Sequence, residues 1–293
     1  MAEPATSPSP VPSSLTTARG RVEYAAAGQG PTVLALHGAM GGWDQAMILA
    51  RTVDLTRFRA VAPSRPGYLG TALAVGRSPD EQADLLAATL DALGVERAAV
   101  LAVSGGGPSA LRFALRHRAR CWALVLVSTV GTPMRGALPL SARLAMWLGR
   151  QGWFAERLRR RLARDPEAPA RRAILDPALR ARTLADPEAG PLFRALLAST
   201  TDRLPLRIEG TRQDVRTGRG PAPPLEQVRV PTLVIHGTAD RTVPFAQHGA
   251  VLARRIPGAE LLALEGGEHV ALFTHRAVIT PRVDAFLRAH APA

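Results

Sequence analysis

Short apolar segments alternate with longer amphipathic segments along most of the chain. Several of the apolar segments, including residues 32–36 and 98–103, are hydrophobic at nearly every position, as is typical of strands covered on both faces. The alternation predicts an α/β fold with a mostly parallel, eight-stranded-type sheet flanked by helices. The predicted strands are residues 21–26, 32–36, 58–62, 98–103, 123–127, 232–236 and 260–264, and the predicted helices are about residues 43–52, 79–93, 105–117, 245–255 and 276–289.

The alternation is interrupted between residues 132 and 228, where the sequence is helical in character, rich in Arg and punctuated by proline. The interruption predicts a helical lid inserted into the sheet domain. Residues 1–18 are rich in Pro, Ser and Ala, with little that can pack, so we expect a flexible N-terminal tail. The expected organisation is a tail at 1–18, an α/β core at 19–131 and 229–293, and a lid at 132–228.

The composition is that of a folded globular protein, with 46% apolar and 21% charged residues. The formal charge of +13 comes from 37 basic residues, all of which are Arg. No nucleic-acid-reading motif accompanies this charge, so we expect no nucleic-acid partner. The predicted lid carries 18 Arg against 9 acidic residues between positions 132 and 225, which leaves two interpretations open: a solvated outer face, or the rim of a pocket that steers anions.

The single cysteine, Cys121, cannot form an intramolecular disulfide and opens an apolar run, so we interpret it as a buried structural thiol. The N-terminus has neither the basic start nor the apolar stretch of a secretory signal. No segment reaches the roughly 18 apolar residues of a membrane span. We therefore expect a cytoplasmic protein without a membrane span.

The most informative segment is an apolar strand that runs directly into Ser104 and then into Gly105, Gly106 and Gly107. A Ser on a sharp strand-to-helix turn requires small residues two positions before and two positions after it, and Ala102 and Gly106 meet this requirement. A phosphate-binding loop is the alternative. A Walker loop requires a Lys, which this chain lacks, and the glycine pattern of a dinucleotide site is absent.

With this turn, the chain resembles the α/β-hydrolase fold superfamily, as a serine-nucleophile, esterase- or lipase-like member with an inserted helical lid. The resemblance implies that Ser104 is the nucleophile. The segment that begins at His37 resembles the loop that supplies one oxyanion-hole amide in this family. The resemblance thus implies an oxyanion hole formed by the backbone amides of Ala39 and Gly105, with Met40 as the alternative to Ala39.

Two further loops resemble the family pattern, in the chain order Ser, Asp, His. Asp240 follows the predicted strand after the lid, and the resemblance implies that it orients the catalytic His. The rival position, after the strand that precedes the lid, offers no acid. His269 follows the last predicted strand in a Gly-containing loop, where the resemblance implies the general base and acid. In this interpretation His37 and the loop of Arg65 have structural roles.

A Ser nucleophile implies acyl transfer to water on a small-molecule substrate, and we expect hydrolysis of a carboxylic ester. Lactonase, thioesterase, amidase or aminopeptidase, carbon–carbon bond hydrolase, perhydrolase or haloperoxidase, and acyltransferase activities stay open, as does a non-catalytic ligand-binding homologue. An aminopeptidase would use acids such as Glu209 and Asp214 to hold an amine, although pairing with the nearby Arg207, Arg212 or Arg216 is the simpler interpretation. No cofactor or metal is expected. The substrate and the oligomeric state are not determined by the sequence.

Overall fold

The fold is built on one sheet whose parallel strands lie at its centre. This computed structural model describes residues 11–136 and 138–292. The strands are β1 (Ser13–Thr17), β2 (Gly20–Ala27), β3 (Thr32–Leu36), β4 (Arg59–Pro63), β5 (Ala98–Val103), β6 (Cys121–Val127), β7 (Thr232–Gly237) and β8 (Glu260–Leu264). Their order in the eight-stranded sheet is β1-β2-β4-β3-β5-β6-β7-β8. β2 pairs antiparallel with both β1 and β4, and the other neighbours are parallel. The predicted fold class is confirmed.

The strand β1 corrects the prediction that residues 1–18 form a flexible tail. Residues 13–17 pair in register with β2, with Leu15 opposite Val22. The buried Thr17 hydroxyl donates a hydrogen bond to the Gly20 carbonyl at 2.8 Å and closes the turn between the two strands. Main-chain pairing and β-branched residues hold a segment that has few apolar side chains to bury. Residues 1–10 of the predicted tail lie outside the described residues.

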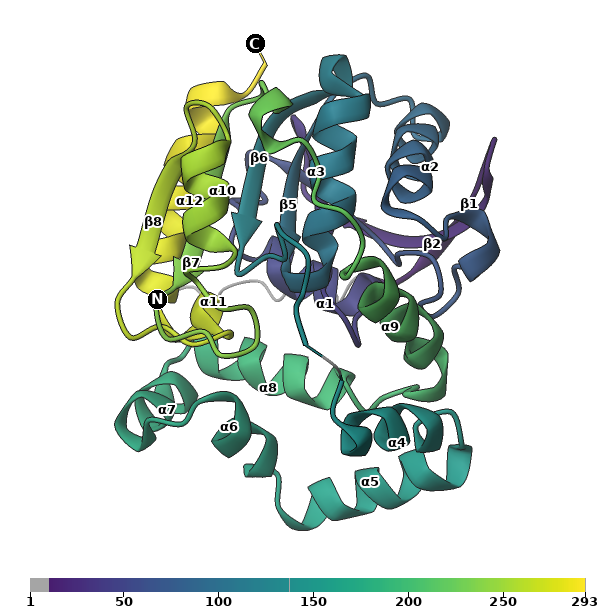
Figure 1. The fold of residues 1–293 in the computed structure, drawn as a ribbon, viewed down its shortest axis with the longest axis vertical. Coiled ribbons are helices and arrows are strands. Elements are labelled where there is room, and N and C mark those ends of the chain that lie inside the picture. Colours follow the sequence, from purple (N-terminus) through teal and green to yellow (C-terminus); the bar gives the residue numbers. More distant parts are fainter. Residues whose placement is uncertain (1–10, 137, 293) are drawn as a thin grey trace, which may run out of the picture.

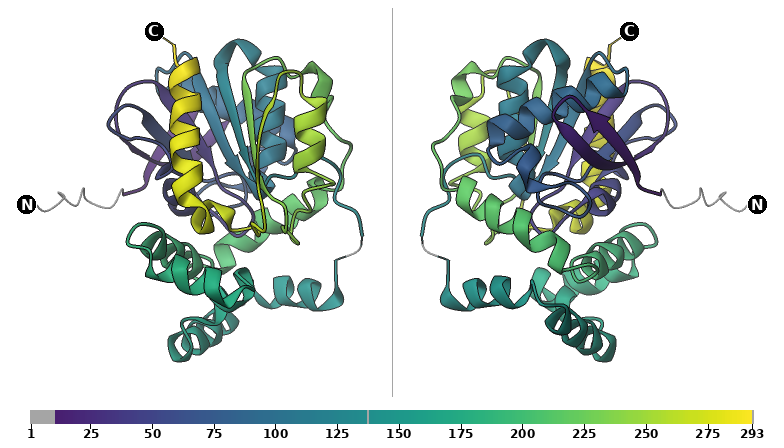
Figure 2. Two further views of the ribbon diagram at one scale, coloured as in Figure 1. Left: turned by 90° about the vertical axis from the view of Figure 1, so that its left-hand side faces the viewer. Right: turned by 90° about the vertical axis from the view of Figure 1, so that its right-hand side faces the viewer.

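Helices cover both faces of the sheet (Figure 1, Figure 2). α1 (Trp43–Ala50), α11 (Ala271–Thr274) and α12 (Arg276–His290) contribute to the core on one face, while α2 (Pro79–Ala92), α3 (Gly107–Arg116) and α10 (Gly249–Arg255) contribute to the core on the other. Within β5, Leu101 belongs to the first core, and Val100 and Ala102 belong to the second. Successive side chains of a strand point to opposite faces, so a strand packed on both sides must be apolar throughout.

The five predicted core helices are present, one of them with a clearly shifted start, and the short α11 was not predicted. α2 begins with a reciprocal cap, in which the Ser78 hydroxyl accepts from the Glu81 amide at 3.2 Å and the Glu81 carboxylate accepts from the Ser78 amide at 2.8 Å. The helix predicted at 245–255 begins only at Gly249. The chain just after Pro244 first forms turns whose amides donate to the Pro244 carbonyl.

The segment between β6 and β7 is helical. It comprises α4 (Leu140–Leu148), α5 (Gly152–Arg164), α6 (Ala168–Ala173), α7 (Pro177–Ala185), α8 (Ala189–Ser199) and α9 (Pro205–Thr217). Figure 1 and Figure 2 show α4 to α8 beyond the carboxyl ends of the parallel strands, at one end of the molecule. The use of these inserted helices as a lid stays a prediction. Across the described chain, no helix combines the length and the hydrophobicity needed to cross a membrane.

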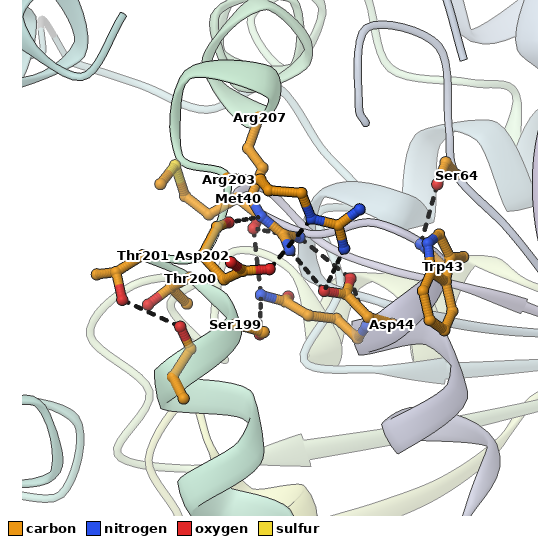
Figure 3. A network of polar contacts seen from close by, with 12 residues as sticks. Met40, Trp43, Asp44, Ser64, Ser199, Thr200, Thr201, Asp202, Arg203 and Arg207 are labelled. Atoms are coloured by element: carbon orange, nitrogen blue, oxygen red, sulfur yellow. Dashed lines mark hydrogen bonds and ion pairs between the residues drawn. The ribbon is translucent and has the colours of Figure 1, made fainter. Parts of the chain in front are cut away.

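A buried ion pair joins α9 to the start of α1 (Figure 3). The Arg207 side chain is fully buried, and its guanidinium contacts both carboxylate oxygens of Asp44, with Nη1 3.1 Å from Oδ1 and Nη2 2.5 Å from Oδ2. The Nε atom donates to the Asp202 carbonyl at 2.8 Å. Asp44 lies in the first turn of α1, where the helix dipole also favours a carboxylate. The pair therefore holds the inserted helices against the sheet domain.

We predict that Arg207→Ala lowers the free energy of unfolding by about 3 kcal/mol, because it leaves a largely buried carboxylate without its partner. The matched control is Arg203→Ala. Arg203 lies 3.9 Å from the same Asp44 oxygen but its side chain is 39% exposed, so its removal should cost less than about 1 kcal/mol. Urea-induced unfolding followed by circular dichroism measures both values. Equal losses in the two variants would contradict the structural role given to Arg207.

Candidate active site

Ser104 lies where β5 ends and a short 3-10 turn, Ser104–Gly106, leads into α3. Its φ angle is 51°, in the left-handed region that non-glycine residues rarely adopt. Its carbonyl accepts a hydrogen bond from the Val130 amide at 3.1 Å, which ties the turn to the loop after β6. The bend places the hydroxyl at the carboxyl edge of the sheet instead of within a strand.

The small residues around Ser104 allow neighbouring backbones to approach the turn. A Cβ atom on Gly106 would lie 2.8 Å from the His37 carbonyl oxygen and 2.9 Å from that of Leu36. A Cβ atom on Gly38 would lie 3.0 Å from the Ser104 Cβ atom. Ala102 is fully buried at the end of β5. The end of β3 therefore presses against the turn at positions where a larger side chain would collide with main-chain atoms.

His269 lies in the loop between β8 and α11, and it contacts both other residues of the predicted triad. Its Nε2 atom is 3.1 Å from Ser104 Oγ, and its Nδ1 atom is 2.8 Å from Asp240 Oδ2. Its side chain is 25% exposed, whereas the Asp240 side chain is fully buried. The neighbouring Glu268 points elsewhere, and its carboxylate accepts a hydrogen bond from the Leu175 amide at 2.8 Å. Glu268 thus ties the His269 loop to the inserted helices.

The loops that carry Asp240 and His269 are joined through their backbones. The Ala239 amide donates to the Gly267 carbonyl at 3.0 Å. A Cβ atom on Gly237 would lie 2.1 Å from the same carbonyl oxygen, so only glycine permits this approach. Residues that are far apart in sequence are therefore brought to hydrogen-bonding distance by two glycine-containing loops.

Asp240 is held as a carboxylate by several donors. Its Oδ1 atom accepts from the amides of Thr242 at 2.9 Å and Val243 at 2.8 Å, and its Oδ2 atom lies 3.4 Å from His236 Nε2 as well as beside His269. Burial alone would raise the pKa of Asp240, but the contacts with His236 and His269 and the Val243 amide outweigh it and hold the pKa well below its ordinary value. Because the folded-state pKa is depressed, the stability from ionised Asp240 is present at neutral pH and is lost only under acid conditions.

His236 is a partner of Asp240 that the sequence reasoning missed. It is completely buried in β7, and its Nε2 atom also donates to the Val243 carbonyl at 2.7 Å. The one available signal was its spacing of four residues from Asp240, but that spacing brings the two side chains together only because the chain turns back after β7.

The Ala39 and Gly105 amides lie close together beside Ser104. A Cβ atom on Gly105 would be 3.3 Å from the Ala39 nitrogen. The Ala39 amide donates no hydrogen bond within residues 11–136 and 138–292. Gly105 is in the first turn of a helix, where amides have no intrahelical partner. The Met40 amide, in contrast, donates to the Thr211 hydroxyl at 3.0 Å. The geometry therefore favours Ala39 over Met40 as an anion-binding donor.

A buried network beside these amides was also missed. The Arg65 guanidinium binds both carboxylate oxygens of Asp214 on α9, at 2.8 and 2.5 Å, and its Nε atom donates to the His37 carbonyl at 2.9 Å. The Tyr68 hydroxyl donates to Asp214 at 2.5 Å. Asp214 therefore pairs with Arg65, which is 149 residues away, and not with the neighbouring Arg residues that the sequence favoured.

His37 is part of the same network and is held by both ring nitrogens. Its Nε2 atom accepts from the Arg65 amide at 2.9 Å, and its Nδ1 atom lies 2.7 Å from the Gly38 carbonyl, to which it donates in the matching tautomer. Complete burial and the nearby Arg65 charge hold the pKa of His37 well below its ordinary value, so the ring is neutral. These contacts agree with the structural role expected for His37.

Two mostly apolar cavities meet at Ser104. The smaller one, of about 160 Å³, is lined by side chains that include Leu49 of α1 and Phe273 of α11, together with His269. The larger one, of about 340 Å³, is also lined by Ser104, together with residues that include Val130 and Val215. A substrate bound across both cavities would have its central atoms at Ser104 Oγ.

Cys121 lies in β6, away from these residues. Burial raises the pKa of its thiol to about 12, which fits the inert structural thiol expected from the sequence. Within the described ranges, no group of three or more His, Cys, Asp or Glu side chains is arranged to hold a metal ion.

A strand-to-helix Ser, a following Asp and a final His at the carboxyl edge of a mostly parallel sheet define the class of α/β-fold hydrolases. Comparison with known proteins agrees, because the family model described as alpha/beta hydrolase fold matches residues 31–276. An alpha/beta hydrolase fold protein from Nakamurella multipartita has a solved structure that superposes with a TM-score of 0.85 at 34% identity, covering 95% of this chain and 99% of that one. The chain belongs to the α/β-hydrolase fold family, and it is an enzyme.

Two relatives of similar length carry related names. A 2-hydroxy-6-oxo-6-phenylhexa-2,4-dienoate hydrolase of Burkholderia cepacia is 26% identical over 92% of this chain and 89% of its own length. A 2-hydroxy-6-oxononadienedioate/2-hydroxy-6-oxononatrienedioate hydrolase of Comamonas testosteroni is 25% identical over the same shares.

The left-handed backbone at Ser104 predicts that a glycine variant at this position is more stable than an alanine variant. Ser104→Gly should be more stable than Ser104→Ala by up to about 1 kcal/mol, because Ala is strained at φ 51° and Gly is not. The control is Ser109, in the first turn of α3, where Ala should be more stable than Gly by about 0.5 kcal/mol. Urea unfolding of the four variants tests the order. A more stable Ala variant at both positions would mean that residue 104 does not occupy the left-handed region.

Proposed function

We propose that this enzyme hydrolyses a carboxylic ester, or a related small acyl compound, through an acyl-enzyme on Ser104. The observation that carries the proposal is the line of hydrogen bonds from Ser104 through His269 to Asp240. Ser104, at the start of this line, lines both of the mostly apolar cavities. A serine hydrolase of the α/β-hydrolase family is the general conclusion, and the ester substrate is the specific proposal.

In the proposed mechanism, Ser104 Oγ attacks the carbonyl carbon while His269 Nε2 takes its proton across the 3.1 Å contact. The carbonyl electron pair moves to oxygen, and the resulting oxyanion accepts hydrogen bonds from the Ala39 and Gly105 amides. Asp240 keeps the proton on His269 Nδ1 and stabilises the imidazolium. The tetrahedral intermediate collapses, the leaving group takes the proton from His269 Nε2, and water repeats the sequence to release the acid.

The lining of the cavities supports an ester more than a free-amine substrate. Asp214, one of the acids considered for holding an amine, already has its carboxylate engaged by the Arg65 guanidinium and the Tyr68 hydroxyl. Glu209, the other, lines a separate hollow with Arg212 and is not part of either cavity at Ser104. An incoming ammonium group would therefore have to compete with a buried guanidinium.

A second candidate is hydrolysis of a carbon–carbon bond next to a ketone. The observation that favours it is the pair of relatives of similar length that are named as hydrolases of hydroxy-oxo-dienoates. Such compounds contain a ketone and a carboxylate but no ester. The same nucleophile and amides would serve this reaction, and Arg135 and Arg219 at the larger cavity offer partners for the carboxylate.

We predict that Ser104→Ala loses at least about 10⁴-fold in kcat/KM on short-chain nitrophenyl esters, because the acyl-enzyme cannot form. The matched control is Ser141→Ala, which changes an exposed serine on α4 and should leave the rate within about twofold of wild type. Mass spectrometry after treatment with a serine-directed phosphonate should place the adduct on Ser104. Comparable rates in Ser104→Ala and wild type would assign the nucleophile to another residue.

Parallel assays on nitrophenyl esters, lactones and a 2-hydroxy-6-oxo-dienoate separate the candidates. If the enzyme is an esterase, kcat/KM should be highest on the esters. If it is a carbon–carbon bond hydrolase, kcat/KM should be highest on the dienoate. A wild-type enzyme that turns over none of these compounds and does not react with the phosphonate would exclude both, and would leave the non-catalytic homologue.

A further inference from the structure

A second hollow, lined by arginine, adjoins the larger cavity at Ser104. It has a volume of about 620 Å³ and lies between α4 and α9. Its charged lining consists of Arg143 from α4 and Arg212, Arg216 and Arg219 from α9 and the residues just after it. We call this hollow the arginine groove.

The arginine groove holds a concentration of positive charge without a balancing acid. No Asp or Glu is among its lining residues. None of its four arginines forms an ion pair within the described parts of the chain, whereas Arg65 and Arg207 each have a buried carboxylate partner. Of the two acids on α9, Asp214 is already paired with Arg65, and Glu209 lines a neighbouring hollow that Arg212 and Arg216 also reach. Like charges four residues apart on a helix repel each other, so the groove is an environment that a bound anion would stabilise.

The arginine groove adjoins the larger cavity at Ser104. Leu138, Val215 and Arg219 line both spaces. The other cavity at Ser104 is smaller, at about 160 Å³, and its lining is mostly apolar. A short acyl chain fits that smaller cavity, so the leaving group of the substrate would extend through the larger cavity into the groove.

We propose that the arginine groove binds the anionic part of the substrate, and that the leaving group carries phosphate. This inference rests on the proposed acyl transfer at Ser104. Arginine binds phosphate oxygens through its planar set of donors, and four guanidinium groups in one space favour a group with several negative charges over a single carboxylate. Trp147, which is 58% exposed and lines the groove, offers a flat surface on which an aromatic base can stack. Acyl thioesters or esters of a nucleotide-bearing carrier have this chemistry.

The test compares two thioesters with the same acyl group. Butyryl-coenzyme A carries phosphates and a base, and butyryl-N-acetylcysteamine carries neither. We expect wild-type kcat/KM to be at least about tenfold higher on the coenzyme A thioester at low salt, and the difference to shrink as NaCl is added, because salt screens exposed charges. Arg212→Ala/Arg216→Ala should raise KM for the coenzyme A thioester about tenfold or more and leave the neutral thioester within about twofold.

The matched control is Arg157→Ala/Arg161→Ala on α5. These two arginines are exposed, have the same spacing of four residues, form no ion pair within the described residues and do not line the groove. This double variant removes the same net charge and should change neither substrate by more than about twofold. Equal losses in the two double variants, or no preference for the coenzyme A thioester in wild type, would overturn the inference.

Two further readouts keep the inference separate from the proposed function. Phosphonate labelling of Ser104 and turnover of the neutral thioester report on the nucleophile alone. Binding of free coenzyme A to Ser104→Ala, measured by calorimetry, reports on the groove alone and should weaken about tenfold with Arg212→Ala/Arg216→Ala. Labelling without coenzyme A binding would refute the groove and leave the hydrolase proposal standing, while binding without labelling would support the groove and refute the nucleophile.

Discussion

The left-handed backbone of Ser104 is the constraint on which the site depends. Because the φ angle is 51°, β5 ends and a helix begins at the same residue, and the hydroxyl stands at the carboxyl edge of the sheet. An L-residue in this conformation costs on the order of 1–2 kcal/mol. The close approach of Gly106 to the carbonyls at the end of β3, together with the Val130 hydrogen bond, holds the turn in place. The contact with His269, the adjacent amides and the junction of the two cavities all follow from this position.

Helix α9 is joined to this edge of the sheet by two buried ion pairs. Arg207 reaches from α9 to Asp44 on α1, and Asp214 of α9 accepts the guanidinium of Arg65 from the loop after β4. The net stability of a buried ion pair is small, but leaving either member without its partner is costly, so each pair specifies one arrangement. The same helix therefore presents Asp214 beside Gly105 and places its exposed arginines next to the larger cavity.

The arginine excess of the inserted segment is used in two different ways. One arginine of α9 is buried with a carboxylate and serves packing, whereas those of the arginine groove face solvent without an acidic partner. In our proposal, the two interpretations of the charge that the sequence left open, a solvated face and an anion-steering rim, apply to different parts of one segment. α5, with exposed arginines such as Arg157 and Arg161, corresponds to the first, and the groove to the second.

Local patterns predicted much of the fold and part of the site. Continuous apolar runs located β3, β5 and β8, and the small residues around Ser104 indicated the turn. These features depend on sterics and periodicity among near neighbours, which a sequence displays directly. Chain order and the family resemblance placed Asp240 and His269 at the ends of strands. Their distances to each other and to Ser104 could not be predicted from the sequence.

Only the tertiary structure decided which distant groups meet. The strand β1 is held by backbone pairing with β2, and its weakly apolar sequence does not predict that pairing. The partner of Asp214 lies 149 residues away, and the choice of Arg65 over nearer arginines follows from how α9 packs. His236 joins Asp240 because the loop after β7 turns back on the strand. The sequence by itself determined the elements and the kinds of residue at the site. Their pairing was decided by packing, because hydrogen bonds and ion pairs depend on spatial distance and not on separation along the chain.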